Sequence, residues 1–248
     1  DVVQTNQAPV ANDIAVSGLE DQATAIVLQG SDADGDTLTF TLLAQPAHGT
    51  LSGSADNWSY LPNANFHGAD SFTYQVDDGQ EVSNVATVSI TIIAVNDVPV
   101  AESVAASTNE DTAVVIDLVG GDIDGDPLSY VLDTSPSNGT VQINGSQATY
   151  QPNPNQHGVD TFSYRVNDGT TDSDVAVVTI DVIAQNDAPT GQSQSLTTSE
   201  DNSISVTLLG FDVDGDALSY TLSQPTSGTL QGTAPNLVYT PNADYSGA

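Results

Sequence analysis

A block of 90 residues recurs along this chain, and that period constrains the possible fold more than any other feature. The acidic loop Asp-X-Asp-Gly-Asp begins at Asp32, at Asp122 and again at Asp212. A Glu-Asp pair begins at Glu20, at Glu110 and at Glu200 with the same spacing. We therefore expect three tandem repeats, each long enough to form a hydrophobic core of its own.

The linker sequences predict where each repeat begins, because Asn6, Asn96 and Asn186 each stand three residues before a proline. We expect the last strand of a preceding repeat at 1–5, the first repeat at 6–95, the second at 96–185 and an incomplete third, without its last two strands, at 186–248. The expected setting is a window on a longer tandem array. A subunit of a self-assembling extracellular filament is the alternative.

Apolar residues alternate with polar ones inside each repeat. Leu38, Phe40 and Leu42 show this period of two, which is typical of strands with one buried face. Turn sequences such as Asn144-Gly145 separate these stretches, and no stretch shows a convincing helical period. The pattern predicts an all-β chain of tandem antiparallel β-sandwiches of cadherin or immunoglobulin type, with about seven strands per repeat, in an elongated array.

The charge of the chain excludes two classes of partner. It has 33 acidic residues and one basic residue, and its net charge is −32. Nucleic acids and anionic membrane surfaces are bound through clusters of Lys and Arg, so we expect neither as a partner. No apolar stretch is long enough to insert into a membrane, and the absence of cysteine excludes disulfides and thiolate metal sites.

Simple alternation of strands A to G brings acids from neighbouring repeats together. The A–B turn, the E–F loop and the linker lie at the far end of one repeat, and the B–C and F–G loops lie at the near end of the next. At the first junction this places together Glu20, Asp21, Asp70, Asn96, Asp97, Asp122, Asp124, Asp126 and Asp168. At the second junction the corresponding residues are Glu110, Asp111, Asp160, Asn186, Asp187, Asp212, Asp214 and Asp216.

Such a cluster needs a counter-charge. Two like charges about 4 Å apart repel by roughly 1 kcal/mol in water and about 4 kcal/mol at an effective dielectric constant near 20. Arg165 is the single cationic side chain of the sequence and cannot neutralise both junctions. Calcium, which takes six to eight oxygen ligands, fits this all-oxygen donor set best, and magnesium comes second. The absence of cysteine and the position of the histidines outside the clusters argue against zinc and copper.

The acidic loop allows two other interpretations, an EF-hand and a solvated turn. An EF-hand requires glycine at position six of its loop, where this chain has Thr37, Pro127 or Ala217. A solvated turn remains the alternative, because Asp and Gly are common turn residues.

Several short motifs resemble those of a known family. They are NDVP (96–99), NED (109–111), DIDGD (122–126), HGVDTFSY (157–164) and NDG (167–169). In these motifs the chain resembles the cadherins, and more closely the bacterial cadherin-like repeats of large surface adhesins.

The resemblance implies calcium ligands from the A–B turn, the E–F region, the linker and the next Asp-X-Asp loop. At the first junction they would be Glu20, Asp70, Asn96, Asp97, Asp122 and Asp124. At the second they would be Glu110, Asp160, Asn186, Asp187, Asp212 and Asp214. Gln7 takes the place of the linker aspartate ahead of Asp32 and Asp34, where a further upstream site would lie.

These observations predict an extracellular or cell-surface module, of the kind found in biofilm adhesins, that calcium stiffens at its junctions. Its expected partners are the neighbouring repeats of the same chain. Direct adhesion, through contacts between copies or with polysaccharide, is the alternative. We do not expect an enzyme, because no nucleophile–base pair can be assembled and the paired carboxylates recur in every repeat. His67 and His157 also recur, but Ser246 fills the same position, which favours a structural turn.

Overall fold

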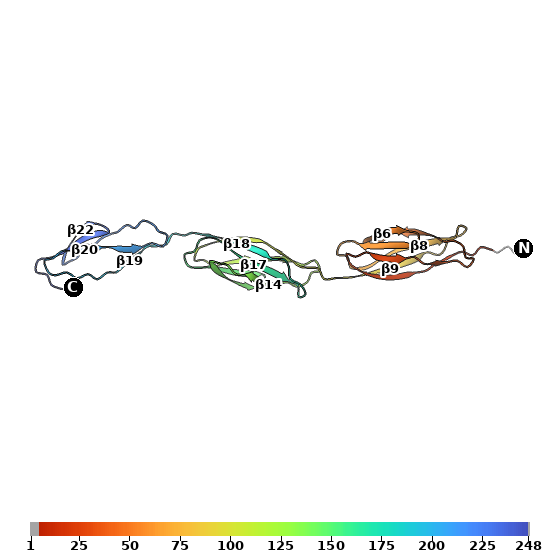
Figure 1. Cartoon of the computed structure of the whole chain (residues 1–248), viewed down its shortest axis with the longest axis horizontal. Coiled ribbons are helices and arrows are strands. Elements are labelled where there is room, and N and C mark those ends of the chain that lie inside the picture. Colours follow the sequence, from red (N-terminus) through yellow and green to blue (C-terminus); the bar gives the residue numbers. More distant parts are fainter. Residues whose placement is uncertain (1–4, 248) are drawn as a thin grey trace. The chain divides into compact units, whose positions relative to one another are not determined.

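The computed structural model describes residues 5–247, which contain strands β1 to β23 and no helix (Figure 1). The predicted all-β class is therefore confirmed. Within these residues no helix could cross a membrane.

The strands of the first repeat form a sandwich of two sheets. The larger sheet has the order β2-β9-β8-β5, the smaller has the order β3-β7-β6, and β1 pairs with β4. The strands are β1 (Val10–Ala11), β2 (Ile14–Leu19), β3 (Thr24–Val27), β4 (Gly30–Ser31), β5 (Thr39–Ala44), β6 (Gly49–Ser54), β7 (Asn57–Pro62), β8 (Gly68–Asp77) and β9 (Ala86–Ile93).

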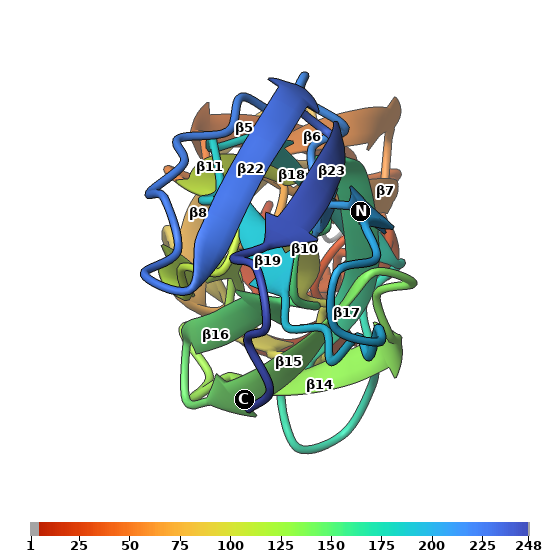
Figure 2. The ribbon, with the colours of Figure 1, turned by 90° about the vertical axis from the view of Figure 1, so that its left-hand side faces the viewer.

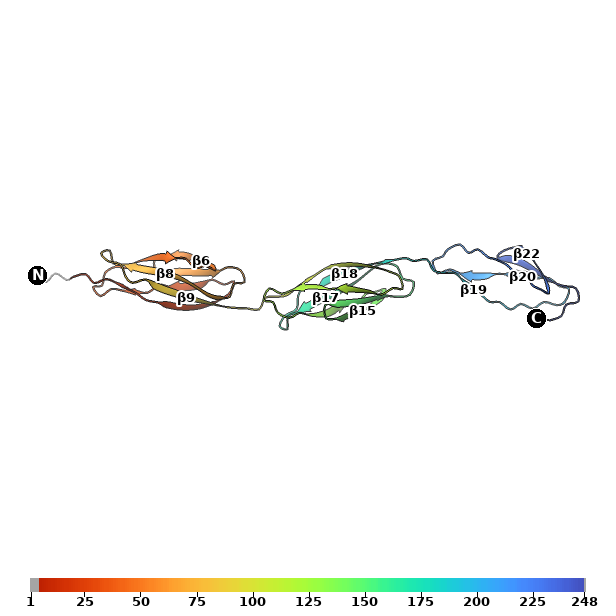
Figure 3. The ribbon, with the colours of Figure 1, turned by 180° about the vertical axis from the view of Figure 1, so that it is seen from behind.

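The second repeat has the same topology, with sheets β11-β18-β17-β14, β12-β16-β15 and β10-β13; β17 and β18 lie side by side in Figure 3. Its strands are β10 (Val100–Glu102), β11 (Val104–Asn109), β12 (Val114–Asp117), β13 (Val119–Gly121), β14 (Ser129–Thr134), β15 (Gly139–Asn144), β16 (Gln147–Pro152), β17 (Gly158–Asn167) and β18 (Ala176–Ile183). In these two repeats β1 and β10 pair with β4 and β13, whereas the strands that follow them, β2 and β11, join the larger sheet and run parallel to β9 and β18.

The third repeat contains a three-stranded sheet in the order β20-β23-β22, with the β22–β23 hairpin facing the viewer in Figure 2. Its strands are β19 (Thr190–Gln192), β20 (Ile204–Thr207), β21 (Leu209–Phe211), β22 (Gly228–Thr233) and β23 (Asn236–Pro241). The alternation of Leu218, Tyr220 and Leu222 predicts a strand here, but the structure has none. In the first repeat the corresponding strand, β5, pairs with β8, and the described part of the third repeat contains no equivalent of β8.

Buried tyrosines connect the short strands to the core of each complete repeat. Tyr74 is fully buried, and its hydroxyl lies 2.6 Å from Asn12 O and 2.7 Å from Gln29 O. Tyr164 repeats this arrangement with Glu102 O and Val119 O. Because a buried hydroxyl is costly without a hydrogen bond, these contacts fix the β1–β4 and β10–β13 pairs on the sandwich.

The chain divides into two compact units that do not coincide with the repeats. One contains the first repeat up to Val100 together with Gly121–Leu128 and Asn167–Ser173, which are loops of the second repeat. The other contains Ala101–Gly120, Ser129–Val166 and the chain from Asp174 onward. The acidic loops of the second repeat therefore belong to the same unit as the end of the first repeat, as the strand alternation predicts.

We predict that Gly139→Ala destabilises the second repeat by about 1–3 kcal/mol. A Cβ atom at Gly139 would lie 2.5 Å from Tyr150 Cε2 and 2.6 Å from Gln151 O, so the hairpin would have to shift. Gly121→Ala is the control, because a Cβ atom there would meet nothing within 4 Å. Urea unfolding followed by tyrosine fluorescence measures the difference, and equal stabilities of the two variants would contradict this account of the packing.

Candidate metal centre

Each Asp-X-Asp-Gly-Asp loop is built around its first aspartate. Asp122 Oδ1 accepts hydrogen bonds from the backbone N–H groups of Asp124 at 3.0 Å and Asp126 at 3.2 Å. Asp32 and Asp212 hold their loops in the same way. The second oxygens of Asp32 and Asp122 are buried and have no hydrogen-bond partner in the described chain. One oxygen therefore shapes the loop, and in Asp32 and Asp122 the other takes no part in it.

The linker docks on these loops through its backbone. The N–H of Asp97 donates to Asp124 Oδ2 at 2.8 Å, and the N–H of Asp187 donates to Asp214 Oδ2 at 2.7 Å. Gln7 makes the same contact to Asp34 at 2.7 Å. This contact uses only the backbone N–H of the linker residue, so it forms with either aspartate or glutamine at that position. The carboxylates of Asp97 and Asp187 therefore remain available for another role.

Asn96 and Asp168 form a second anchor for the linker. Asn96 Nδ2 donates to Asp168 Oδ2 at 2.9 Å, and both oxygens of Asp168 accept further hydrogen bonds from Thr170 and Thr171. The hydrogen bond from Asn96 and those from the Thr171 and Thr170 backbone outweigh burial and lower the pKa of Asp168. Asp168 therefore lies at the junction as predicted, but the structure gives it the role of an anchor whose oxygens are already occupied.

Glu20 lies in the turn after β2 and is only 3% exposed. One carboxylate oxygen, Oε1, accepts a hydrogen bond from the N–H of Val95. The other, Oε2, is buried without a hydrogen-bond partner among the described residues, and His67 Nδ1 is 3.9 Å from it. Glu110 is 4% exposed and is held in the same manner. Its Oε1 accepts a hydrogen bond from the N–H of Gln185, and its Oε2 lies 3.8 Å from His157 Nδ1.

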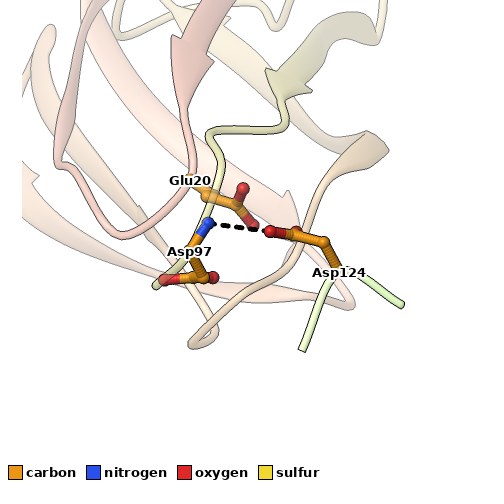
Figure 4. A group of neighbouring side chains, drawn as sticks. All are labelled: Glu20, Asp97 and Asp124. Atoms are coloured by element: carbon orange, nitrogen blue, oxygen red, sulfur yellow. Dashed lines mark hydrogen bonds between the residues drawn. The ribbon is translucent and has the colours of Figure 1, made fainter. Parts of the chain in front are cut away.

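Glu20, Asp97 and Asp124 meet at the first junction (Figure 4). Each offers one carboxylate oxygen, and these oxygens lie within 4.8 Å of one another. Burial, followed by the charges of Asp124, Asp21, Glu20 and Asp122, raises the pKa of Asp97. The guanidinium of Arg165 lies 3.0 Å from Asp133, away from this group, and the basic side chain beside Glu20 is His67.

The second junction repeats the electrostatics of the first. Burial, and then the charges of Asp214, Asp111, Glu110 and Asp212, raise the pKa of Asp187. One oxygen of Asp187, Oδ2, is buried without a hydrogen-bond partner in the described chain. Acids that are distant in sequence therefore influence one another at both junctions. The three acids of each acidic loop also bring oxygens within 4.8 Å of one another: Asp32, Asp34 and Asp36; Asp122, Asp124 and Asp126; Asp212, Asp214 and Asp216.

The groups of neighbouring acids do not include Asp70 and Asp160. Asp70 accepts hydrogen bonds from the N–H groups of Ala47, His48 and Ser71 and from the hydroxyl of Tyr60. Asp160 makes the same four contacts in its own repeat, with Ser137, Asn138, Tyr150 and Thr161. Their carboxylates stabilise the turn that follows β5 or β14, so no oxygen is left without a partner.

Asn65 lies at the first junction, although the sequence motifs did not predict it there. The loop aspartates Asp21, Asp111 and Asp201 have positive φ and accept, through Oδ1, the N–H groups of Asn65, Asn155 and Asp244 respectively. The amide of Asn65 also lies against Asp21 Oδ2 and Asp97 Oδ2, at 3.2 and 3.3 Å when its nitrogen faces them. The motif recurs as PNAN (62–65), PNPN (152–155) and PNAD (241–244), and this recurrence could have indicated the position. The same residues are also typical of an ordinary turn.

The comparisons with known proteins agree with this architecture. The family model described as Bacterial Ig domain matches residues 6–91, 96–181 and 186–248. The chain therefore belongs to the bacterial Ig domain family, in three tandem copies, and the resemblance to bacterial cadherin-like repeats is confirmed.

Individual relatives are more distant. Integrin beta-like protein A of Dictyostelium discoideum is 27% identical over 242 residues, which cover 76% of this chain and 12% of that protein. Extracellular cadherin domains 1–4 of protocadherin gamma B7 superpose with a TM-score of 0.51 at 13% identity, over 95% of this chain and 68% of theirs. An endo-fucoidan hydrolase of glycoside hydrolase family 107 matches 72% of this chain and 29% of its own, at 24% identity with a TM-score of 0.32, which is too low to indicate catalysis.

We predict that Asp70→Asn destabilises the first repeat at pH 7 and that the difference from the unaltered protein shrinks in acid. Burial opposes ionisation of Asp70, but the hydrogen bonds from Ala47, His48, Tyr60 and Ser71 outweigh it and lower its pKa. Because the pKa is lower in the folded protein, ionised Asp70 adds to the free energy of unfolding. This contribution is complete above the ordinary aspartate pKa of about 3.9 and is lost as the pH falls through the pKa that Asp70 has in the folded protein.

Urea unfolding at pH 7 and at pH 3 in chelator measures this difference. Asp181→Asn, which alters an exposed carboxylate on β18, is the control. An equal effect of Asp70→Asn at both pH values would contradict the assignment.

Proposed function

We propose that this chain is a calcium-binding adhesion-type module of an extracellular or surface protein, with calcium held at the junctions between its repeats. The observation that carries the proposal is the buried carboxylate oxygen of Glu20, which has no hydrogen-bond partner in the described chain and belongs to the same group as Asp97 and Asp124. Buried charges in proteins are paired or bind metals.

The donor set fits calcium. Glu20 Oε2, the free oxygen of Asp122, the carboxylate of Asp97 and that of Asp124 are all hard oxygen ligands, and water or backbone carbonyls can complete a shell of six to eight. Magnesium prefers one or two carboxylates with several waters, so a group of this acidity suits it less well. Asp187, Glu110, Asp111, Asp212 and Asp214 would supply the corresponding groups at the second junction.

The chain itself prepares this site. Backbone hydrogen bonds already hold the linker on the acidic loop, and Asn96 fixes it to Asp168. A shared cation would add a connection from the turn at Glu20 to both of these segments. Because ligand binding stabilises the form that binds, free calcium at 100 times its dissociation constant would contribute about 2.7 kcal/mol to the ordered junction.

The family and the fold support an extracellular setting, where calcium sites with dissociation constants of about 10⁻⁴–10⁻³ M are common. The partner of each repeat would be the next repeat of the same chain. The alternative role is direct adhesion through contacts between copies or with a polysaccharide. Binding assays with and without chelator separate it from a spacer role, in which the stiffened repeats only extend the protein.

We predict that Glu20→Gln weakens calcium binding at the first junction by at least about tenfold, because it removes one charged ligand while keeping the acceptor for Val95. Isothermal calorimetry on the whole chain measures this, with Glu110→Gln as the matched change at the second junction and Asp181→Asn as a control for net charge. Absence of calcium binding to the unaltered protein would refute the proposed function.

We also predict that calcium makes the junctions stiffer, because the same acids that repel one another become shared ligands. Small-angle scattering in chelator and in calcium should show a narrower range of conformations with the ion. An unchanged scattering curve for a protein that binds calcium would separate binding from stiffening and contradict the spacer role.

A further inference from the structure

Backbone hydrogen bonds fix the loop that carries Asn65. The side-chain amide of Asn65 is not needed to hold the loop and can rotate. Phe66 N–H donates to Asn63 O at 3.0 Å, which closes a turn, and Asn65 occupies it with φ of 56°. The N–H of Asn65 donates to Asp21 Oδ1 at 3.0 Å. Asparagine tolerates this left-handed conformation better than most residues, so the position is suited to Asn, Asp or Gly.

The amide of Asn65 faces two carboxylates. With its nitrogen turned inward it donates to Asp21 Oδ2 at 3.2 Å and to Asp97 Oδ2 at 3.3 Å. With its oxygen turned inward, three oxygens would face one another with no proton between them, which is unfavourable unless a cation lies there. A primary amide can present either end after a half-turn of its last torsion.

We propose that Asn65 acts as a reversible ligand of the junction cation. Without the ion its NH2 group holds Asp21 and Asp97 together, and with the ion its oxygen turns inward and joins the calcium shell. This inference rests on the proposed function. It adds Asp21 and the amide of Asn65 to the group of Glu20, Asp97 and Asp124, where the buried oxygen Oε2 of Glu20 has no hydrogen-bond partner in the described chain.

The other repeats show which substitutions the loop accepts. Asn155 occupies the same position with φ of 54° and donates its N–H to Asp111, and Asp244 does so with φ of 58° toward Asp201. The third repeat therefore carries a carboxylate where the first two carry an amide. An aspartate or a glycine at position 65 should keep the turn and its backbone hydrogen bond.

The two variants have opposite expected effects on calcium binding. Asn65→Asp replaces a neutral oxygen by a charged one, so it should tighten binding about fivefold while lowering the melting temperature in chelator through repulsion from Asp21 and Asp97. Asn65→Gly removes the side chain and should weaken calcium binding about fivefold. If the amide were only a donor in the ion-free state, its removal would leave calcium binding unchanged or make it tighter.

The experiment is a calorimetric calcium titration of the whole chain in these variants, with melting curves in chelator. Ala64→Asp is the control for charge, because it adds a carboxylate one residue away on an exposed position of the same turn. The proposal requires weaker binding in Asn65→Gly and a larger gain in Asn65→Asp than in Ala64→Asp. Equal affinity of Asn65→Gly and the unaltered protein would overturn it while leaving the proposed function intact, whereas no binding to the unaltered protein would remove the function itself.

Discussion

The close approach of carboxylates at the junction is the constraint on which the rest of the site depends. Glu20, Asp97 and Asp124 come from a turn, a linker and a loop, and they bring oxygens within 4.8 Å of one another. Like charges this close repel one another, and the burial of Glu20 limits how far water screens that repulsion. The sequence has a single Lys or Arg residue to offset this repulsion, which supports the proposal of a bound divalent cation.

Neutral hydrogen-bond donors hold the junction together. The backbone N–H of Asp97, the amide of Asn96 and the N–H groups inside each acidic loop hold the acids in place. Each complete repeat has its own core, anchored by tyrosines such as Tyr74 and Tyr164. Folding of a repeat and ordering of its junction are therefore separable, and the proposed cation concerns only the second.

The repeat and the alternation of apolar residues were sufficient to predict the sandwich and to predict that Glu20, Asp97 and Asp124 lie at one junction. These patterns could not predict the hydrogen-bond partners of individual side chains. Asp70 lies at the predicted end of the repeat, yet the turn after β5 uses both of its oxygens. Asn65 is a turn residue by composition, and its contact with Asp97 depends on how the linker docks. The strand expected around Tyr220 has no pairing partner among the described residues.

The central claim is that a cation occupies the group formed by Glu20, Asp97 and Asp124. Crystals grown in calcium, with diffraction collected at a wavelength where calcium scatters anomalously, test it most directly. The account predicts an anomalous peak within about 2.3–2.6 Å of Glu20 Oε2 and of carboxylate oxygens of Asp97 and Asp124. A well-ordered junction without such a peak, in which protons or water satisfy Glu20, would contradict it.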